Sequence, residues 1–185
     1  MKRIHLGCGN KILEGFINCD IRPGPGVSRV FDLEKCPWPF EAATIDFIET
    51  CETLEHLSWR VQERVFVEMH RILVPGGRIN LQVPDIGKMC HNYVNGEICD
   101  CVPHKANTKE EFLASAGCEK CSGKGIVNPT RWLMAFCGAQ KHPWDTHRTM
   151  FTREYLEELA AKSNLRVVKY DEHPYKLKAL LEKDK

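Results

Sequence analysis

The sequence predicts an α/β fold with a doubly wound, mostly parallel sheet, and three observations support this. Short β-rich runs alternate with turns and one helical stretch over residues 1–85, which is typical of a parallel sheet with crossover connections. A glycine-rich turn directly follows the first run, where an open α/β sheet places its ligand. A helix and two β-rich runs near the end of the chain predict an antiparallel strand pair that closes the sheet edge, with the last strand antiparallel.

Seven short segments are predicted as strands because they are apolar or β-rich and are bounded by turn residues. These segments comprise residues 3–6, 15–19, 28–31, 45–49, 78–83, 165–172 and 178–182.

Two helices are predicted from apolar residues at helical spacing. The first spans residues 59–73, with Ser58 as its N-cap and Pro75-Gly76-Gly77 as the segment that ends it. Its apolar stripe predicts a core-facing side formed by Val61, Val65, Met69 and Ile72. The second helix spans residues 152–163 and is capped by Thr152.

The length and net charge of the chain restrict the kinds of protein that the sequence can encode. A chain of 185 residues fits a single domain with a small insertion, so we expect one domain over residues 1–185. The formal net charge of +1 at pH 7 provides no broad basic surface for nucleic acid or an anionic membrane. The first apolar run is far too short for a signal peptide or a membrane span. We therefore expect a cytoplasmic protein without a membrane partner, and the sequence predicts no oligomeric state.

The segment Leu6-Gly7-Cys8-Gly9-Asn10 is the strongest candidate for a ligand site. Two glycines one residue apart allow a sharp turn and a close approach to a bound molecule, because neither carries a Cβ and both accept positive φ. By itself, such a turn fits plain chain geometry as well as it fits a cofactor pocket.

This turn and four later segments occur in an order that resembles the class I S-adenosylmethionine-dependent methyltransferases. The five segments are LGCGN, FINCDI, FDLEKCPWPF, IDFIETCETLEHL and RILVPGGRINLQVPD. The resemblance covers residues 3–85 and 145–182 and implies a seven-stranded, Rossmann-like methyltransferase sheet. It also implies that S-adenosylmethionine is the cofactor and that the first turn passes under its methionine part, which corresponds to Gly7, Cys8, Gly9 and Asn10.

The same resemblance implies roles for residues at the ends of later strands. Asp20 corresponds to the acidic residue that holds the two ribose hydroxyls, and Asp32 to the one beside the adenine amino group. A carboxylate is a suitable acceptor for both a vicinal diol and an exocyclic amine. The backbone amide of Leu33 would meet the adenine ring. Cys51 and Glu52, near the end of the fourth strand, are candidates for lining the pocket.

A nicotinamide-binding domain is the nearest competing use of the glycine turn. Its fingerprint needs a third glycine at the sixth position of the motif, where Ile12 stands. It also places its acidic residue about twenty positions further on, whereas Asp20 follows Gly9 by eleven. A parallel crossover normally takes about a dozen residues or more, so this spacing predicts a first crossover helix reduced to a turn or two at residues 11–14. A compact subgroup of the methyltransferases resembles this arrangement.

His56, in the segment LEHL, could exchange protons near neutral pH. We favour a supporting role for it, because in the methyltransferases that LEHL resembles this segment mainly supports the loop beside the cofactor.

Residues 86–145 are rich in Cys, His, Asn, Gly and Lys, show little periodicity, and are predicted to form an insertion on the acceptor side. Two close cysteine pairs stand sixteen residues apart, and four thiolates satisfy tetrahedral Zn²⁺: Cys99, Cys101, Cys118 and Cys121. The second pair lies in CEKCSGKG, which resembles one CxxCxGxG repeat of the J-domain chaperone zinc region. We expect a structural zinc here, with unligated thiols as the alternative. One ligand could be replaced by Cys90, His91 or His104.

The acceptor side also carries candidates for a catalytic base. Methyltransferases of this architecture commonly build their acceptor pocket between the fifth strand and the last helix, a region that here includes Arg131-Trp132 and residues 142–148. A hydroxyl or a protonated amine must lose a proton during transfer, and His147, His142 or Asp145 could accept it. Alternatively, Asp145 and His147 cap the following helix and fix the loop.

The sequence therefore predicts methyl transfer from S-adenosylmethionine to an oxygen or nitrogen nucleophile. It contains no Asn/Asp-Pro-Pro-aromatic tetrapeptide of the kind that nucleic-acid amino methyltransferases carry, which favours a small-molecule or glycan acceptor. Two alternatives stay open. One is a binding or regulatory module whose zinc insertion engages a protein or nucleic acid, and the other is a methyltransferase acting on RNA or DNA.

Overall fold

The structure, a computed structural model, describes residues 1–95 and 136–184. The chain divides into two compact units, of which the first contains residues 1–86 and 147–185 and the second residues 87–146. Several residues singled out in the sequence lie outside the described residues: Cys99, Cys101, His104, Cys118, Cys121, Arg131 and Trp132.

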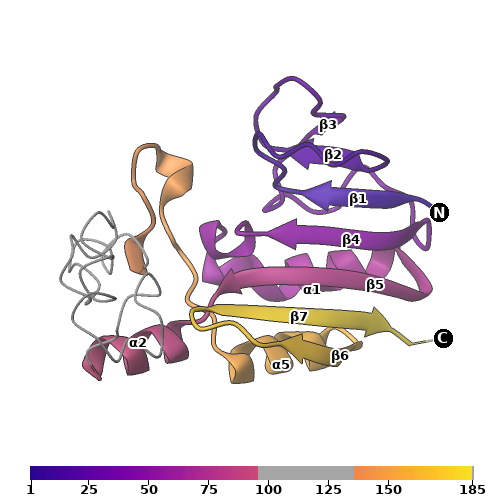
Figure 1. Cartoon of the computed structure of the whole chain (residues 1–185). Coiled ribbons are helices and arrows are strands. Elements are labelled where there is room, and N and C mark those ends of the chain that lie inside the picture. The colour runs from indigo at the N-terminus through magenta and orange to yellow at the C-terminus, as the bar shows by residue number, and fades with distance from the viewer. Residues whose placement is uncertain (96–135, 185) are drawn as a thin grey trace, which may run out of the picture. The chain divides into compact units, whose positions relative to one another are not determined.

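The first unit contains a seven-stranded sheet in the order β3-β2-β1-β4-β5-β7-β6 (Figure 1). The strands are β1 (Arg3–Leu6), β2 (Ile17–Asp20), β3 (Arg29–Val30), β4 (Ile45–Cys51), β5 (Leu73–Pro84), β6 (Leu165–Asp171) and β7 (Lys176–Lys183). The first five pair in parallel, and β7 is antiparallel to both β5 and β6. The predicted α/β class, with a mostly parallel sheet and an antiparallel last strand, is confirmed.

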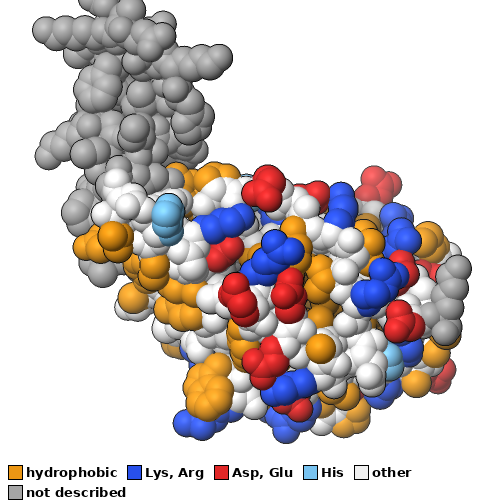
Figure 2. Space-filling view, turned by 90° about the horizontal axis from the view of Figure 1, so that it is seen from below, with side chains coloured by type: hydrophobic (Ala, Val, Ile, Leu, Met, Phe, Trp, Pro, Cys, Tyr) orange, Lys and Arg blue, Asp and Glu red, His pale blue; other side chains and the backbone are white. Residues whose placement is uncertain are grey.

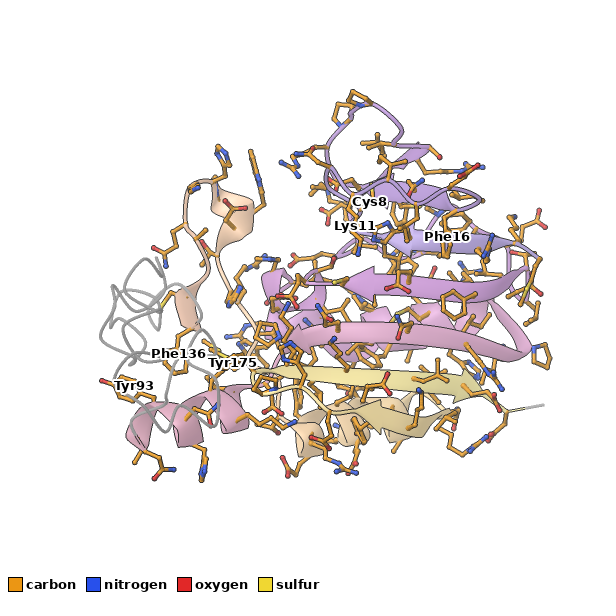
Figure 3. All side chains as sticks on the ribbon, in the orientation of Figure 1. Cys8, Lys11, Phe16, Tyr93, Phe136 and Tyr175 are labelled. Atoms are coloured by element: carbon orange, nitrogen blue, oxygen red, sulfur yellow. The ribbon has the colours of Figure 1, made fainter. Side chains whose placement is uncertain are left out.

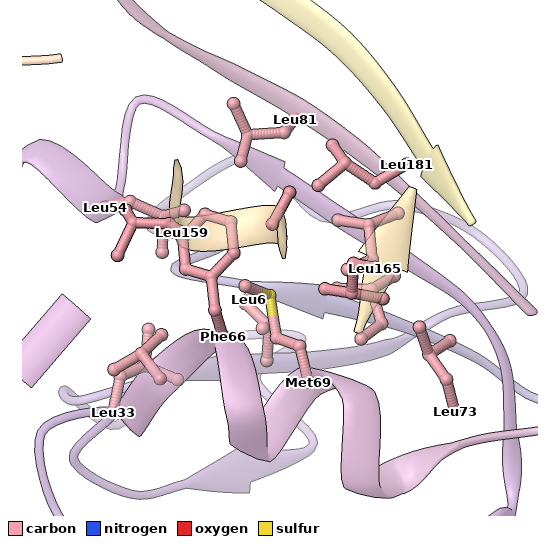
Figure 4. Close-up of a cluster of buried hydrophobic side chains, with 14 of the residues drawn as sticks. Leu6, Leu33, Leu54, Phe66, Met69, Leu73, Leu81, Leu159, Leu165 and Leu181 are labelled. Atoms are coloured by element: carbon pink, nitrogen blue, oxygen red, sulfur yellow. The ribbon is translucent and has the colours of Figure 1, made fainter. Parts of the chain in front are cut away.

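The core of this unit lies between the sheet and two helices on one of its faces, α1 (Gln62–Ile72) and α5 (Arg153–Lys162) (Figure 1). Figure 4 shows Leu6, Leu81 and Leu181 of the sheet close to Phe66 and Met69 of α1, and all five side chains are fully buried. Burying each such side chain stabilises the fold by about 1.5–3 kcal/mol.

The predicted helices form with the predicted apolar faces. Val65, Met69 and Ile72 of α1 are fully buried, while Val61 packs against the core from a short 3₁₀ turn, η2 (Trp59–Val61). The Ser58 side chain caps this turn by accepting a hydrogen bond from the backbone N–H of Arg60 at 3.4 Å.

Helix α1 ends just before Pro75-Gly76-Gly77, as predicted, and these three residues lie inside β5. The helix ends at Ile72, because buried Leu73 adopts an extended conformation and pairs with Ile45 of β4. A register shift in that pairing follows, so the proline and the glycines form an irregularity within the strand. The strand predicted over residues 78–83 therefore begins earlier, at Leu73, because pairing with β4 extends it.

The connection from β1 to β2 contains no helix, so the predicted helical turn at residues 11–14 is wrong. Instead, the Asn18 side chain fixes this connection from its buried position on β2. Its amide oxygen accepts a hydrogen bond from the Leu13 N–H at 3.0 Å, and its amide nitrogen donates to the carbonyls of Leu13 and Phe16 at 3.0 and 3.3 Å. Figure 3 shows Cys8, Lys11 and Phe16 along this connection.

The second unit leaves the first at the start of α2 (Ile86–Val94), and the chain rejoins the first unit before α5. Within the first unit, Asp85 forms a parallel bridge with Phe151, and the Ile86 N–H donates to the Phe151 carbonyl at 2.9 Å. The points of departure and return are therefore hydrogen-bonded to each other.

Within the second unit, the described residues form α2, a short 3₁₀ turn η3 (Pro143–Asp145) and an antiparallel bridge between Gly138 and Thr146. The rings of Tyr93 and Phe136 meet edge to face with their centroids 6.4 Å apart (Figure 3).

The surface of the molecule carries mixed charge. Figure 2 shows lysine and arginine side chains interspersed with aspartate and glutamate on one face. On α5 and β6, ion pairs join Arg153 to Glu157, Lys162 to Glu158 and Lys169 to Asp171. Across residues 1–95 and 136–184, no helix combines the length and the apolar character needed to cross a membrane.

Candidate functional site

The predicted cofactor residues lie at the carboxyl ends of adjoining parallel strands. Gly7 follows β1, Asp20 ends β2 and Cys51 ends β4, and these three strands are neighbours in the sheet. Figure 1 shows their arrowheads pointing to the same edge. This is the edge at which open α/β sheets bind ligands.

The two glycines of the turn have different physical roles. Both have positive φ, +65° at Gly7 and +51° at Gly9. A Cβ at Gly7 would overlap Cγ2 and Oγ1 of Thr53 and lie 2.8 Å from its Cβ, so Gly7 is required by packing. A Cβ at Gly9 would meet nothing closer than a terminal nitrogen of Arg22, 3.9 Å away. The backbone at Gly9 therefore borders open space that a ligand can approach.

Cys8 holds the turn against the sheet, whereas Asn10 is exposed. The Cys8 side chain is buried, and its backbone N–H donates to the Cys19 carbonyl at 2.9 Å. Burial raises the pKa of the Cys8 thiol, and the nearby Asp20 charge adds to this effect. The thiol therefore stays protonated at neutral pH.

Asp20 joins the end of β2 to the glycine turn. Its Oδ2 accepts a hydrogen bond from the Gly9 N–H at 2.8 Å. Its Oδ1 accepts from the backbone N–H and the Nε of Arg22 at 3.0 and 3.3 Å. Because an ionised carboxylate has about four acceptor positions, Asp20 can accept these three hydrogen bonds and still accept one more from a ligand hydroxyl.

Asp32 and Leu33 follow the short strand β3, on the far side of β2. The Phe31 N–H donates to the Asp20 carbonyl at 3.1 Å, which brings this segment alongside Asp20. Asp32 Oδ1 accepts from the Glu34 N–H at 2.9 Å. Leu33 is mostly buried, and its carbonyl accepts from the indole nitrogen of Trp38 at 3.1 Å.

Cys51 and Glu52 are connected to β5 by one side chain. The Gln82 amide nitrogen lies 3.1 Å from both Cys51 Sγ and Glu52 Oε1. Glu52 has a φ of +53°, which a non-glycine residue rarely adopts, and Lys176 Nζ lies 3.4 Å from its carboxylate. Burial, together with the Glu52 charge, raises the pKa of the Cys51 thiol.

The three candidate bases are not all in one unit. His142 and Asp145 belong to the second unit, where the His142 ring stacks on Trp144 with centroids 4.8 Å apart. His147 belongs to the first unit and meets His56 edge to face, with ring centroids 5.0 Å apart. Thr152, rather than Asp145 or His147, caps α5.

Glu55, which was not predicted from the sequence as a site residue, precedes His56 in the 3₁₀ turn η1 (Leu54–His56) after β4. Its side chain is 1% exposed, and neither carboxylate oxygen has a hydrogen-bond partner. Burial raises the pKa of Glu55 well above its ordinary value, and the charge of Glu52 adds to this effect. An acidic residue directly before a histidine at a strand end is the sequence signal that could have drawn attention to it.

Comparisons with known proteins agree with this geometry. Residues 16–81 match the model of a methyltransferase domain. A comparison with curated proteins gives no match.

Solved structures of low sequence identity share the fold. An S-adenosylmethionine-dependent methyltransferase from Mesorhizobium loti aligns with a TM-score of 0.55 and 13% identity over 98% of this chain and 90% of that one. The 1,6-didemethyltoxoflavin-N1-methyltransferase of Burkholderia thailandensis was solved with 1,6-didemethyltoxoflavin and S-adenosylhomocysteine. It aligns with a TM-score of 0.56 and 13% identity over 99% of this chain and 71% of that one. A protein from Pyrococcus horikoshii aligns with a TM-score of 0.60 and 15% identity over 99% of this chain and 82% of that one.

The chain therefore has the Rossmann-like fold of the S-adenosylmethionine-dependent methyltransferases. The match over residues 16–81 to a methyltransferase domain lies within that fold.

Proposed function

We propose that the chain transfers a methyl group from S-adenosylmethionine to an oxygen or nitrogen atom of a small-molecule or glycan acceptor. The observation that carries this proposal is the hydrogen bond from the Gly9 amide to Asp20, at the edge where β1 and β2 end. It joins a turn that borders open space to a carboxylate at the sheet edge where ligands bind.

The residues at this edge fit the cofactor. The backbone around Gly9 and Asn10 can follow its methionine part, Asp20 can accept a hydrogen bond from the ribose hydroxyls, and Asp32 can accept one from the adenine amine. When bound, S-adenosylmethionine supplies an electrophilic methyl group on a sulfonium. The contribution of the chain is to hold the reacting atoms in line, and positioning of this kind can supply about 7–11 kcal/mol of the barrier.

Two observations support a small molecule or glycan as the acceptor. The net charge of +1 and the mixed charges of the face in Figure 2 differ from the basic surface that phosphate backbones select. The sequence also lacks the Asn/Asp-Pro-Pro-aromatic run of nucleic-acid amino methyltransferases. His142, Asp145 and His147 remain predicted candidates for the proton acceptor.

Calorimetric titration with S-adenosylmethionine tests the donor half of this proposal. We expect Asp20→Ala to weaken binding by roughly 10- to 100-fold, because a hydrogen bond to a charged group contributes about 1.5–3 kcal/mol. Asp171→Asn is the control, since Asp171 lies on β6 and pairs with Lys169. Binding that Asp20→Ala leaves unchanged would contradict the proposed cofactor site.

A screen of acceptors, with release of S-adenosylhomocysteine as the readout, tests the acceptor half. We expect turnover with a hydroxylated or amine-bearing small molecule or a glycan. Turnover with RNA or DNA alone, accompanied by strongly salt-dependent binding, would instead favour the nucleic-acid alternative.

A further inference from the structure

Two segments distant in the sequence bring three ligand-type side chains together beside the sheet. Glu55 and His56 lie in η1 directly after β4, and His147 lies where the chain re-enters the first unit. One carboxylate oxygen and one nitrogen from each imidazole all lie within 4.8 Å of one another. Ligand atoms around one tetrahedral ion at about 2.1 Å stand roughly 3.4 Å apart, so side-chain rotations that bring these atoms closer by at most about 1.4 Å complete the ligand set.

Backbone hydrogen bonds hold these two segments together. The N–H groups of Arg148 and Thr149 both donate to the Glu55 carbonyl, at 2.7 and 3.0 Å. The Thr149 hydroxyl donates to the Leu57 carbonyl at 2.7 Å, and the Gln62 side chain donates to both Thr149 Oγ1 and the Leu54 carbonyl. The three side chains therefore project from a preorganised backbone rather than from independent loops.

The buried carboxylate of Glu55 is a separate observation that points to a missing ligand. Both of its oxygens are buried without a hydrogen-bond partner. Leaving a buried polar group unsatisfied costs about 1–3 kcal/mol, and more for a charged group. Protein structures rarely tolerate this, and an ion is one of the recognised explanations when they do. A divalent cation between Glu55 and the two imidazoles would give the carboxylate a partner.

We propose that Glu55, His56 and His147 bind one divalent transition-metal ion of the Zn²⁺ type. One carboxylate and two imidazoles match the ligand preferences of Zn²⁺, and three protein ligands leave at least one coordination position for an oxygen donor. On the proposed function, that donor is water or an acceptor hydroxyl, whose pKa a bound ion lowers. In this assignment His147 holds the ion and is not the proton acceptor.

Titration of the full-length, metal-depleted protein with Co²⁺ tests this site, because the visible spectrum of Co²⁺ reports its ligands. For the ion at this site we expect d–d bands without a thiolate charge-transfer band. The missing thiolate band distinguishes this ion from one held by the cysteines of residues 86–145. Glu55→Gln and His147→Ala should each weaken that binding at least 10-fold. A second ion with thiolate bands, if the cysteines bind one, should be retained in both variants.

The matched control is His70→Ala, which removes a histidine in the last turn of α1, outside the cluster. It should leave the thiolate-free cobalt signal unchanged. Circular dichroism of each variant establishes that it is folded, and Glu55→Gln preserves the shape of the side chain if His147→Ala is unstable.

Two results would overturn the proposal. In the first, the wild-type protein binds no cobalt, or binds cobalt only with a thiolate spectrum. In the second, the thiolate-free cobalt signal persists in folded protein carrying Glu55→Gln or His147→Ala. Calorimetry with S-adenosylmethionine on the same samples keeps the two proposals separate. Cofactor binding without the metal contradicts only the ion site, and metal binding without the cofactor contradicts only the proposed methyl transfer.

Discussion

Replacing Gly7 with alanine should destabilise the protein through a clash within the fold itself. The added Cβ would overlap Cγ2 and Oγ1 of Thr53 and lie 2.8 Å from its Cβ. Thr53 cannot easily move, because it is mostly buried and its hydroxyl lies within hydrogen-bonding distance of the carbonyls of Leu6 and Cys51, at 3.3 and 3.1 Å. The glycine turn and the loop after β4 therefore constrain each other.

Two costs add in this substitution. An alanine in the left-handed conformation at φ +65° costs about 1–2 kcal/mol, and overpacking of a well-packed site costs about 1–3 kcal/mol. We therefore expect Gly7→Ala to lower the free energy of unfolding by about 2–5 kcal/mol. Gly9→Ala meets only the first cost, about 1–2 kcal/mol, because a Cβ there has no neighbour closer than 3.9 Å.

Urea denaturation at equilibrium measures both substitutions, since the midpoint shift at constant slope gives the change in unfolding free energy. Thr53→Ala combined with Gly7→Ala removes two of the three overlapping atoms. The double variant should therefore be more stable than the sum of the single effects predicts, by about 1–3 kcal/mol.

Calorimetry on the same variants separates the two glycines by function. Gly9→Ala should weaken S-adenosylmethionine binding more than its small effect on stability explains, because its Cβ would enter the space assigned to the cofactor. Equal destabilisation by Gly7→Ala and Gly9→Ala, or a double variant without coupling, would contradict the proposed clash between residue 7 and Thr53.

Two further predictions concern Asn18, which bonds the connection between β1 and β2, and Glu68, which lies on α1. Asn18→Ala removes the acceptor for the Leu13 N–H and two donated hydrogen bonds, so it should lower the free energy of unfolding by about 1–3 kcal/mol. It should also speed amide hydrogen exchange over residues 7–16. Unchanged exchange there would count against the role of Asn18. Burial alone would raise the pKa of Glu68, but hydrogen bonds from Arg71 and the Trp38 amide lower this pKa overall. Ionised Glu68 therefore stabilises the fold at pH values above its unfolded-state pKa. This contribution to stability is lost as the pH falls through its folded-state pKa. Glu68→Gln should therefore lower stability at neutral pH by about 1–3 kcal/mol and flatten the acid limb of the pH–stability curve, and an acid limb parallel to that of the wild type would contradict this assignment.

Elements defined by local periodicity could be predicted from the sequence. The stripe of Val65, Met69 and Ile72 predicted α1 and its buried face, because helical spacing and burial arise from the same 3.6-residue repeat. The position of Asp20 at the end of β2 was also predictable, since chain order and strand ends are local properties.

Features decided by distant partners could not be predicted in this way. The segment Pro75-Gly76-Gly77 joins β5 because Leu73 pairs with Ile45, and the first connection forms without a helix because the Asn18 side chain bonds its backbone. The meeting of Glu55 with His147 depends on how the chain returns to the first unit. Periodicity and spacing carry no information about such contacts.

The bridge between Asp85 and Phe151 has a consequence for how this protein can diversify. Because the chain leaves and rejoins the sheet at two hydrogen-bonded positions, the sheet requires only that the intervening segment return to its starting point. Each doubling of the length of a flexible segment costs only about 0.6 kcal/mol in closure entropy. Strand pairing in the seven-stranded sheet is therefore little affected by the length of the sequence inserted between Asp85 and Phe151, and this is a point at which the chain can vary while the sheet stays the same.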